Sequence, residues 1–283
     1  MTRQAILTMT ALAPAIWGTT YLVTTEMLPD GHPFMASMLR ALPAGLLLVA
    51  ITRQLPPRNW LLKIAVLGGL NFAVFWSMLF VAAYRLPGGL AATLIAVQPL
   101  MVLVLSSVVL GTRVGIVGFL AALAGIAGVG LLVLGPDVPW DTWGIAAALT
   151  ATVSMGAGTV MARKWQPPVS PLTFTGWQLS AGGLLLLPVA LIVEPNWPMP
   201  TALHMAGYLW LGIVGAAVTY FFWFRGIAML GPSVVTVFNF FSPLTAALLG
   251  WFWLEQSMTT HQLVGAGVIL GSVWLGQRAG RRV

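Results

Sequence analysis

Long apolar runs separated by short polar gaps dominate the pattern along this chain of 283 residues. Most runs approach the roughly 20 apolar residues that a helix needs to cross a bilayer. The gaps hold turn formers, as in LPDGHP, QLPPRN and QPPVSP. We predict ten membrane-spanning helices, over Ala5–Thr25, Phe34–Thr52, Leu62–Ala82, Gly88–Leu110, Gly115–Leu134, Trp143–Met161, Pro171–Val193, Leu203–Trp223, Pro232–Leu254 and Gln262–Gln277.

The composition points to the same class, an all-α integral membrane protein. The chain is 59% hydrophobic and 7% charged, whereas a soluble domain carries about 25% charged residues. Backbone groups in lipid must be bonded within their own segment, which favours helices, and these runs are too long for barrel strands. The absence of cysteine excludes disulfides and zinc–thiolate sites. We expect no metal and no cofactor.

Basic residues follow the positive-inside rule when the N-terminus is placed in the cytoplasm. The cytoplasmic gaps then collect 11 of the 13 basic residues: Arg3, Arg53, Arg58, Lys63, Arg113, Arg163, Lys164, Arg225, Arg278, Arg281 and Arg282. The acids all fall on the outer side: Glu26, Asp30, Asp137, Asp141, Glu194 and Glu255. We therefore predict that both termini are cytoplasmic. The net charge of +7 then reflects topology and not a nucleic-acid interface.

Two segments in the middle of apolar runs resemble each other. IAVQPLMVLVLSSVVLG, which starts at residue 95, matches NFFSPLTAALLGWFWLE, which starts at residue 239. The offset of 144 residues places Pro99 opposite Pro243. In a second match, MLRALPAGLLL aligns with GWQLSAGGLLL at an offset of 138, which places Arg40 opposite Gln178. The gaps of the two halves also carry opposite charges, as inverted copies require.

These matches predict two inverted repeats of five helices, residues 1–138 and 139–283. An odd number of spans reverses the second copy in the membrane. Inverted repeats are typical of secondary transporters, whose substrate site lies near the bilayer midplane between the copies.

The chain also resembles the drug/metabolite transporter superfamily, specifically its EamA family, over its whole length. The resemblance rests on AIWGTTYLV with Trp17 and Gly18, on FMASMLRAL, on AYRLPGGLAATLIAVQPL, and on FRGIAMLGPSVVTVFNFFSPLTAALLGWFWLE. Within that family the chain is most similar to the YddG-type amino-acid exporters of bacteria. Many relatives carry an acid after the fourth helix, as Glu255 follows the ninth here, but this chain has Gly111 in that place.

The resemblance implies a central cavity lined by helices of both halves, with the fifth and tenth helices at the periphery. It also implies export of amino acids or similar metabolites across a bacterial inner membrane by alternating access.

Polar groups in the apolar interior are costly and mark candidate pathways. The candidate substrate-binding residues are Trp17, Arg40, Asn71, Trp76, Gln98, Trp177, Gln178, Tyr220 and Asn239. Pro99 and Pro243 are candidate hinges, because a proline frees a backbone carbonyl in its helix. The competing interpretations are a plain kink for each proline, packing for each aromatic residue, and a structural bond to helix carbonyls for Arg40.

The leading hypothesis is a secondary transporter that exports amino acids, hydrophobic or aromatic ones above all, or related metabolites. It would act as a monomer in the lipid bilayer on a small-molecule substrate. Because no carboxylate is deep, facilitated diffusion or exchange is favoured over proton antiport. One alternative is efflux of drugs or other metabolites. A membrane enzyme is less favoured, because the three histidines lie apart from one another without carboxylates nearby.

Overall fold

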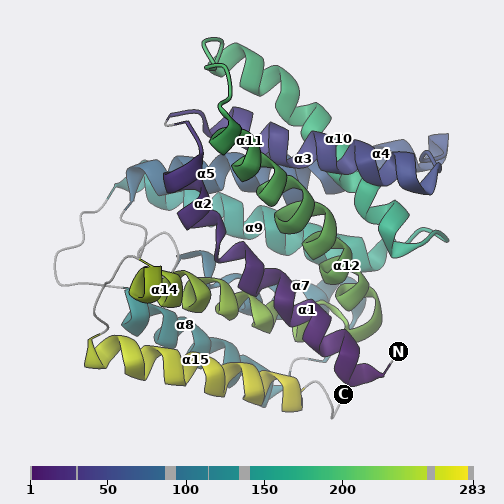
Figure 1. The fold of residues 1–283 in the computed structure, drawn as a ribbon. Coiled ribbons are helices and arrows are strands. Elements are labelled where there is room, and N and C mark those ends of the chain that lie inside the picture. The colour runs from purple at the N-terminus through teal and green to yellow at the C-terminus, as the bar shows by residue number, and fades with distance from the viewer. Residues whose placement is uncertain are drawn as a thin grey trace.

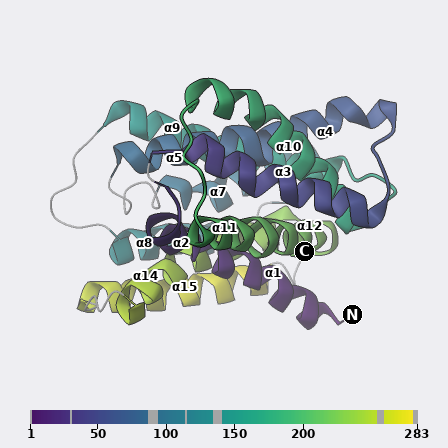
Figure 2. The ribbon, with the colours of Figure 1, turned by 45° about the horizontal axis from the view of Figure 1, so that its top comes forward.

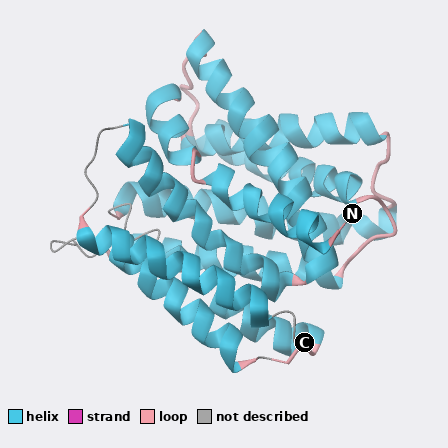
Figure 3. Ribbon diagram, turned by 60° about the horizontal axis from the view of Figure 1, so that its bottom comes forward, coloured by secondary structure: helices cyan, strands magenta, loops and turns pink. Residues whose placement is uncertain are grey.

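The computed structural model describes residues 2–29, 31–86, 94–113, 115–133, 141–253 and 259–279. Over these residues the chain forms helices joined by short loops, without a strand (Figure 3). The α-helices are α1 (Arg3–Trp17), α2 (Thr20–Met27), α3 (Pro33–Thr52), α4 (Leu61–Gly68), α5 (Phe75–Arg85), α7 (Gln98–Leu110), α8 (Ile116–Val133), α9 (Thr142–Lys164), α10 (Pro171–Val193), α11 (Ala202–Leu209), α12 (Thr219–Leu230), α13 (Pro232–Val235), α14 (Phe241–Trp253) and α15 (Thr260–Ala279).

Six helical stretches in the described part of the chain are long and apolar enough to cross a membrane: Arg3–Thr24, Pro33–Thr52, Arg58–Ala82, Thr142–Lys164, Pro171–Val193 and Ala202–Leu230. Shorter apolar helices cover Gln98–Leu110 and Ile116–Leu132. The all-helical membrane architecture is thereby confirmed. The count of ten spans stays a prediction. The first residues of the predicted fourth span, and Glu255, lie outside the described residues.

Both candidate hinge prolines lie in the first turn of a helix, directly after an interruption. Pro99 is the second residue of α7 and follows a turn at residues 96–97. Pro243 is the third residue of α14 and follows the 3-10 helix η4 (Thr236–Phe240). A proline is tolerated in the first helical turn, where its missing N–H has no intrahelical partner to lose. The predicted breaks therefore exist, and each precedes its proline.

Two further irregularities were not predicted. The π-helical segments η2 (Gly69–Val74) and η3 (Trp210–Val218) interrupt the stretches that run from α4 to α5 and from α11 to α12. They end at Val74 and Val218, 144 residues apart. This is the same offset that relates Pro99 to Pro243. A π-helical segment leaves backbone carbonyls out of the regular ladder, and such segments are frequent at functional sites.

Helices α3 and α10 cross as an antiparallel pair at close range. A methyl group on Gly45 would clash with the backbone of Ser180, and one on Gly183 would lie 2.6 Å from the Cα of Leu42. The two contacts exchange when 138 is added to one residue number and subtracted from the other. In Figure 1 this pair lies toward one side of the bundle, and α8 with α15 lies at the opposite edge.

A second reciprocal contact relates α1 to α9. Gly18, next to the end of α1, packs against Thr245 of α14, and Gly156 of α9 packs against Met101 of α7. The glycines are 138 residues apart and their partners 144 apart. Figure 2 shows α3, α9 and α10 in one layer of the molecule and α1, α14 and α15 in the other.

Candidate functional site

Aromatic side chains from residues 1–138 and 139–283 meet inside the bundle. We call Trp17, Phe72, Trp76, Tyr220 and Trp223 the aromatic cluster. The ring of Tyr220 lies 4.7 Å from that of Trp17 and 4.7 Å from that of Phe72, measured between centroids. Trp76 lies 5.2 Å from Phe72, and Trp223 lies 5.1 Å from Trp17. The structure thus brings together the predicted Trp17, Trp76 and Tyr220 and adds Phe72 and Trp223.

Arg40, on α3, borders the aromatic cluster. Its side chain is buried, with 5% of its surface exposed. The guanidinium carbon lies 4.6 Å from the ring centroid of Trp76, and Nη2 donates a hydrogen bond of 2.8 Å to the carbonyl of Gly215. Gly215 belongs to the π-helical segment η3, where carbonyls leave the helical ladder. Nε of Arg40 is buried without a partner.

Asn71 and Gln178 form a second buried contact. Nδ2 of Asn71, in η2, donates to Oε1 of Gln178, on α10, over 2.9 Å, and neither side chain is exposed. The amide of Gln178 also points back to the carbonyl of Phe174 at 3.5 Å. Oδ1 of Asn71 has no partner and lies against Gly158 of α9. The contact therefore ties α10 to η2 across a surface that has no room for another side chain.

The two contacts correspond to each other. Arg40 and Gln178 are 138 residues apart and each lies seven residues into its helix. Their partners Gly215 and Asn71 are 144 residues apart, on the two π-helical segments. Because α3 and α10 are antiparallel, the contacts lie toward opposite ends of the helix pair. One contact carries a charge and the other is neutral.

Gln98 and Asn239 form a third polar pair, which also joins the two halves. Nδ2 of Asn239 donates to Oε1 of Gln98 over 2.7 Å. Gln98 is buried at the first residue of α7, beside Pro99, and Asn239 lies in η4. Nε2 of Gln98 and Oδ1 of Asn239 are buried and unbonded. The pair therefore has one spare donor and one spare acceptor, placed at two helix interruptions.

Tryptophan–threonine bonds hold α1 and α2 against the π-helical segment η3. Nε1 of Trp17 donates to Thr219 over 2.9 Å, and Nε1 of Trp210 donates to Thr19 over 3.0 Å. Trp177 lies elsewhere: its Nε1 donates over 2.6 Å to the backbone carbonyl of Gln54, just beyond the end of α3. This bond gives Trp177 a structural contact away from the aromatic cluster.

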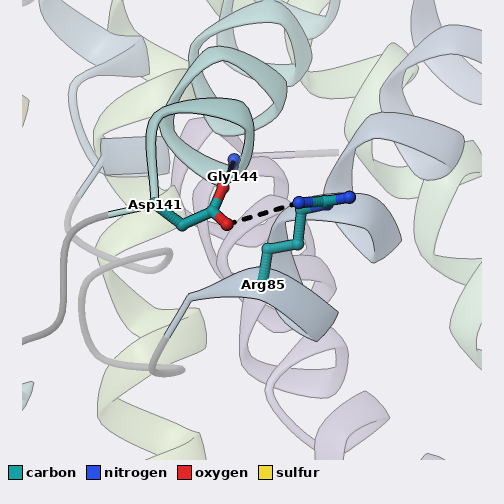
Figure 4. Close-up of polar contacts among 3 residues, drawn as sticks. All are labelled: Arg85, Asp141 and Gly144. Atoms are coloured by element: carbon teal, nitrogen blue, oxygen red, sulfur yellow. Dashed lines mark hydrogen bonds and ion pairs between the residues drawn. The ribbon is translucent and has the colours of Figure 1, made fainter.

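Carboxylates in the described residues lie at helix ends. Glu194 accepts hydrogen bonds of 2.9 and 2.8 Å from the backbone N–H groups of Phe34 and Met35, at the start of α3. Asp141 accepts from the N–H of Gly144 over 2.6 Å and pairs with Arg85 at 3.3 Å (Figure 4). The Gly144 bond, with Arg85, lowers the pKa of Asp141. Within the described part of the chain no group of three or more metal-ligating side chains is present.

The fold and the paired polar groups define a multi-pass membrane protein with helices of both halves around a buried polar and aromatic interior. The EamA-like transporter family matches the chain twice, over residues 4–134 and 142–276. The chain therefore belongs to the EamA family and is a transporter of the drug/metabolite superfamily.

Named relatives agree with this assignment. The protein PecM of Dickeya dadantii is 45% identical over 92% of this chain and 88% of its own length. The uncharacterized inner membrane transporter YedA of Escherichia coli K12 is 27% identical, over 92% and 86%. A protein of known crystal structure superposes with a TM-score of 0.85 over 99% of both chains, at 20% identity, which speaks for the fold alone.

Proposed function

We propose that this transporter exports hydrophobic or aromatic amino acids, or related small metabolites, by alternating access. The observation that carries the proposal is the Gln98–Asn239 pair, which joins the two halves at helix interruptions with a spare donor and a spare acceptor. A spare amide donor suits a carboxylate and a spare carbonyl suits an ammonium group. The aromatic cluster beside Arg40 suits an apolar side chain.

Alternating access in this proposal uses two inverted repeats of five helices, residues 1–138 and 139–283, around a central cavity. The reciprocal packing of Gly45 and Gly183, and the equal offsets of the π-helical segments and of the two prolines, support it. The interruptions before Pro99 and Pro243 would be the hinges, because a helix bends most easily where its hydrogen-bond ladder is already broken.

The proposed location is a bacterial inner membrane with both termini in the cytoplasm. Contacts between gaps that the charge pattern assigns to one face support this topology. Asp141 meets Arg85 on the predicted outer face, and Gln54 accepts a hydrogen bond of 3.3 Å from Thr173 on the predicted inner face. The relative YedA is named as an inner membrane transporter.

Efflux of drugs or other metabolites is the second candidate, favoured by the breadth of the aromatic cluster, whose π faces would accept many apolar bodies. Cationic drugs fit less well, because Arg40 would repel them.

Efflux from proteoliposomes tests the proposal. Vesicles loaded with labelled L-phenylalanine, L-leucine or L-tryptophan should release at least one of them through the reconstituted protein. Gln98→Ala and Asn239→Ala should slow release while reconstituting normally, and Arg85→Gln is the matched surface control. A failure to release any neutral amino acid would overturn the proposal. Repeating the assay with a pH gradient shows whether transport is coupled to protons.

A further inference from the structure

We propose that Arg40 binds the carboxylate of the transported molecule and that the substrate class is apolar or aromatic monocarboxylates, with or without an amino group. The binding role stands on the geometry around Arg40, and its part in transport rests on the proposed function. The inference widens the substrate class beyond amino acids and makes the carboxylate its defining group.

The first reason is the unused hydrogen-bonding capacity of a buried cation. A guanidinium offers five N–H donors in a fork that matches a carboxylate. In Arg40 one nitrogen is bonded to the carbonyl of Gly215, and Nε is buried without a partner. A carbonyl contributes only a partial charge, so the guanidinium remains without a full counter-charge. Burying a charge in that condition is costly, and a bound anion would relieve the cost.

The second reason is that the described acids are engaged or placed elsewhere. Glu194 is bonded to the N-terminus of α3, Asp141 to Gly144 and Arg85, and Glu26 is exposed. No ion pair between Arg40 and a described carboxylate exists within 4.0 Å. The part of the chain that the structure describes thus supplies a cation at this place and no anion to match it.

The third reason is that the fold does not require a charge at this position. Gln178 holds the corresponding place on α10 and makes the corresponding contact, to η2, as a neutral amide. A glutamine at position 40 could therefore bond the Gly215 carbonyl and complete the packing. The positive charge of Arg40 is an addition to the structural role, and a ligand is what it is suited to bind.

The surroundings of Arg40 define the remainder of the ligand. Trp76 stacks on the guanidinium, and Tyr220 lies 6.1 Å from Trp76 between ring centroids, so a molecule held by Arg40 would place its body on aromatic faces. An ammonium group there would meet rings, which bind cations weakly, and no described carboxylate. The amino group should therefore add little to the affinity.

Calorimetric titration of the full chain in detergent micelles, with matched acids and amides, tests the inference. The probes are L-phenylalanine, 3-phenylpropionate, L-phenylalaninamide and 3-phenylpropionamide. Wild type should bind each acid about tenfold or more tightly than its amide, since hydrogen bonds to charged groups contribute about 1.5–3 kcal/mol. The two acids should differ by less than that factor.

Variants identify the residue responsible. Arg40→Gln should erase the preference for acids, Arg40→Lys should keep part of it, and Arg85→Gln should leave it at the wild-type value. Equal binding of acids and amides by wild type, binding of no probe, or a preference that survives in Arg40→Gln would each overturn the inference. If the glutamine variant does not fold, an undiminished preference in Arg40→Lys together with Arg85→Gln would count against the guanidinium fork.

The same protein in vesicles separates this inference from the proposed function. Preferential binding of acids without efflux of any acid would remove the transport proposal and leave the Arg40 site standing. Efflux without a preference for acids would do the reverse.

Discussion

The Arg40–Gly215 and Asn71–Gln178 contacts occupy corresponding places and do different chemistry. In each, a polar side chain seven residues into α3 or α10 reaches a π-helical segment. The neutral contact joins two amides, and Gly158 closes its remaining side. The charged contact joins a guanidinium to one carbonyl and leaves Nε unbonded.

This difference separates structure from function within one architecture. What the two contacts share, a bond from a long helix to a π-helical segment, holds the bundle together. What only one has, a buried positive charge, is available for a ligand. A duplicated fold can therefore bind an asymmetric molecule by changing one residue of a corresponding pair.

The largest effect is expected from breaking the charged contact. Arg40→Gln should lower efflux of labelled L-phenylalanine about tenfold or more, because a charge-assisted hydrogen bond to the substrate is lost. Gln178→Ala should act mainly on stability, since it leaves the buried Nδ2 of Asn71 unpaired at a cost of about 1–3 kcal/mol. Efflux per reconstituted protein and the midpoint of thermal unfolding measure the two. Equal losses of efflux in both variants would dissolve the distinction.

A smaller effect is expected from crowding the neutral contact. A methyl group at Gly158 would clash with Oδ1 of Asn71, so Gly158→Ala should lower the thermal midpoint by several degrees. At Gly215 the added methyl would lie 3.5 Å from Nη2 of Arg40, an ordinary contact, so Gly215→Ala should change the midpoint little. Gly267, on α15, has open space and is the matched control. A normal midpoint for Gly158→Ala would show that the neutral contact adjusts freely.

The Gln98–Asn239 pair should be weaker than either contact, because its groups are only half used. A double-mutant cycle with Gln98→Ala and Asn239→Ala should give a coupling free energy of about 0.6–1.7 kcal/mol, the scale of hydrogen bonds between membrane helices. Unfolding in detergent mixtures measures it. A coupling free energy near zero would mean that the two amides do not depend on each other.

The smallest effect is expected at the exposed end of α9. Asp141 has a lowered pKa in the folded protein, so its contribution to stability is present above the unfolded value of about 3.9 and is lost as pH falls through the lower folded value. Asp141→Asn keeps a helix-capping side chain. Its thermal midpoint should lie slightly below that of wild type at pH 7 and converge with it below about pH 4. A constant difference across this range would exclude the titration of Asp141 as the cause.

Much of this arrangement is readable from the sequence. The alignment of residues 38–48 with 176–186 already paired Arg40 with Gln178, and the offset of 144 already paired the two prolines. The π-helical segments were not readable, because they contain no proline and interrupt no apolar run. Their only sequence signal is a higher density of glycine, as at Gly68–Gly69.

The partners of the polar side chains were also hidden. Arg40 bonds a backbone carbonyl, which any residue at position 215 would supply, so no residue type announces the contact. Trp177 satisfies its N–H at a loop carbonyl of Gln54, and composition alone could not separate it from the aromatic cluster. Contacts to backbone depend on where helices cross, which periodicity does not specify.

A structure of the wild-type chain bound to L-phenylalanine or 3-phenylpropionate, whichever binds more tightly, tests the central claim most directly. The account predicts a carboxylate oxygen at about 2.7–2.9 Å from a guanidinium nitrogen of Arg40. It also predicts the aromatic ring against Trp76 or Tyr220, and the Asn71–Gln178 bond intact. A ligand bound elsewhere, with Arg40 still bonded only to the carbonyl of Gly215, would contradict the account.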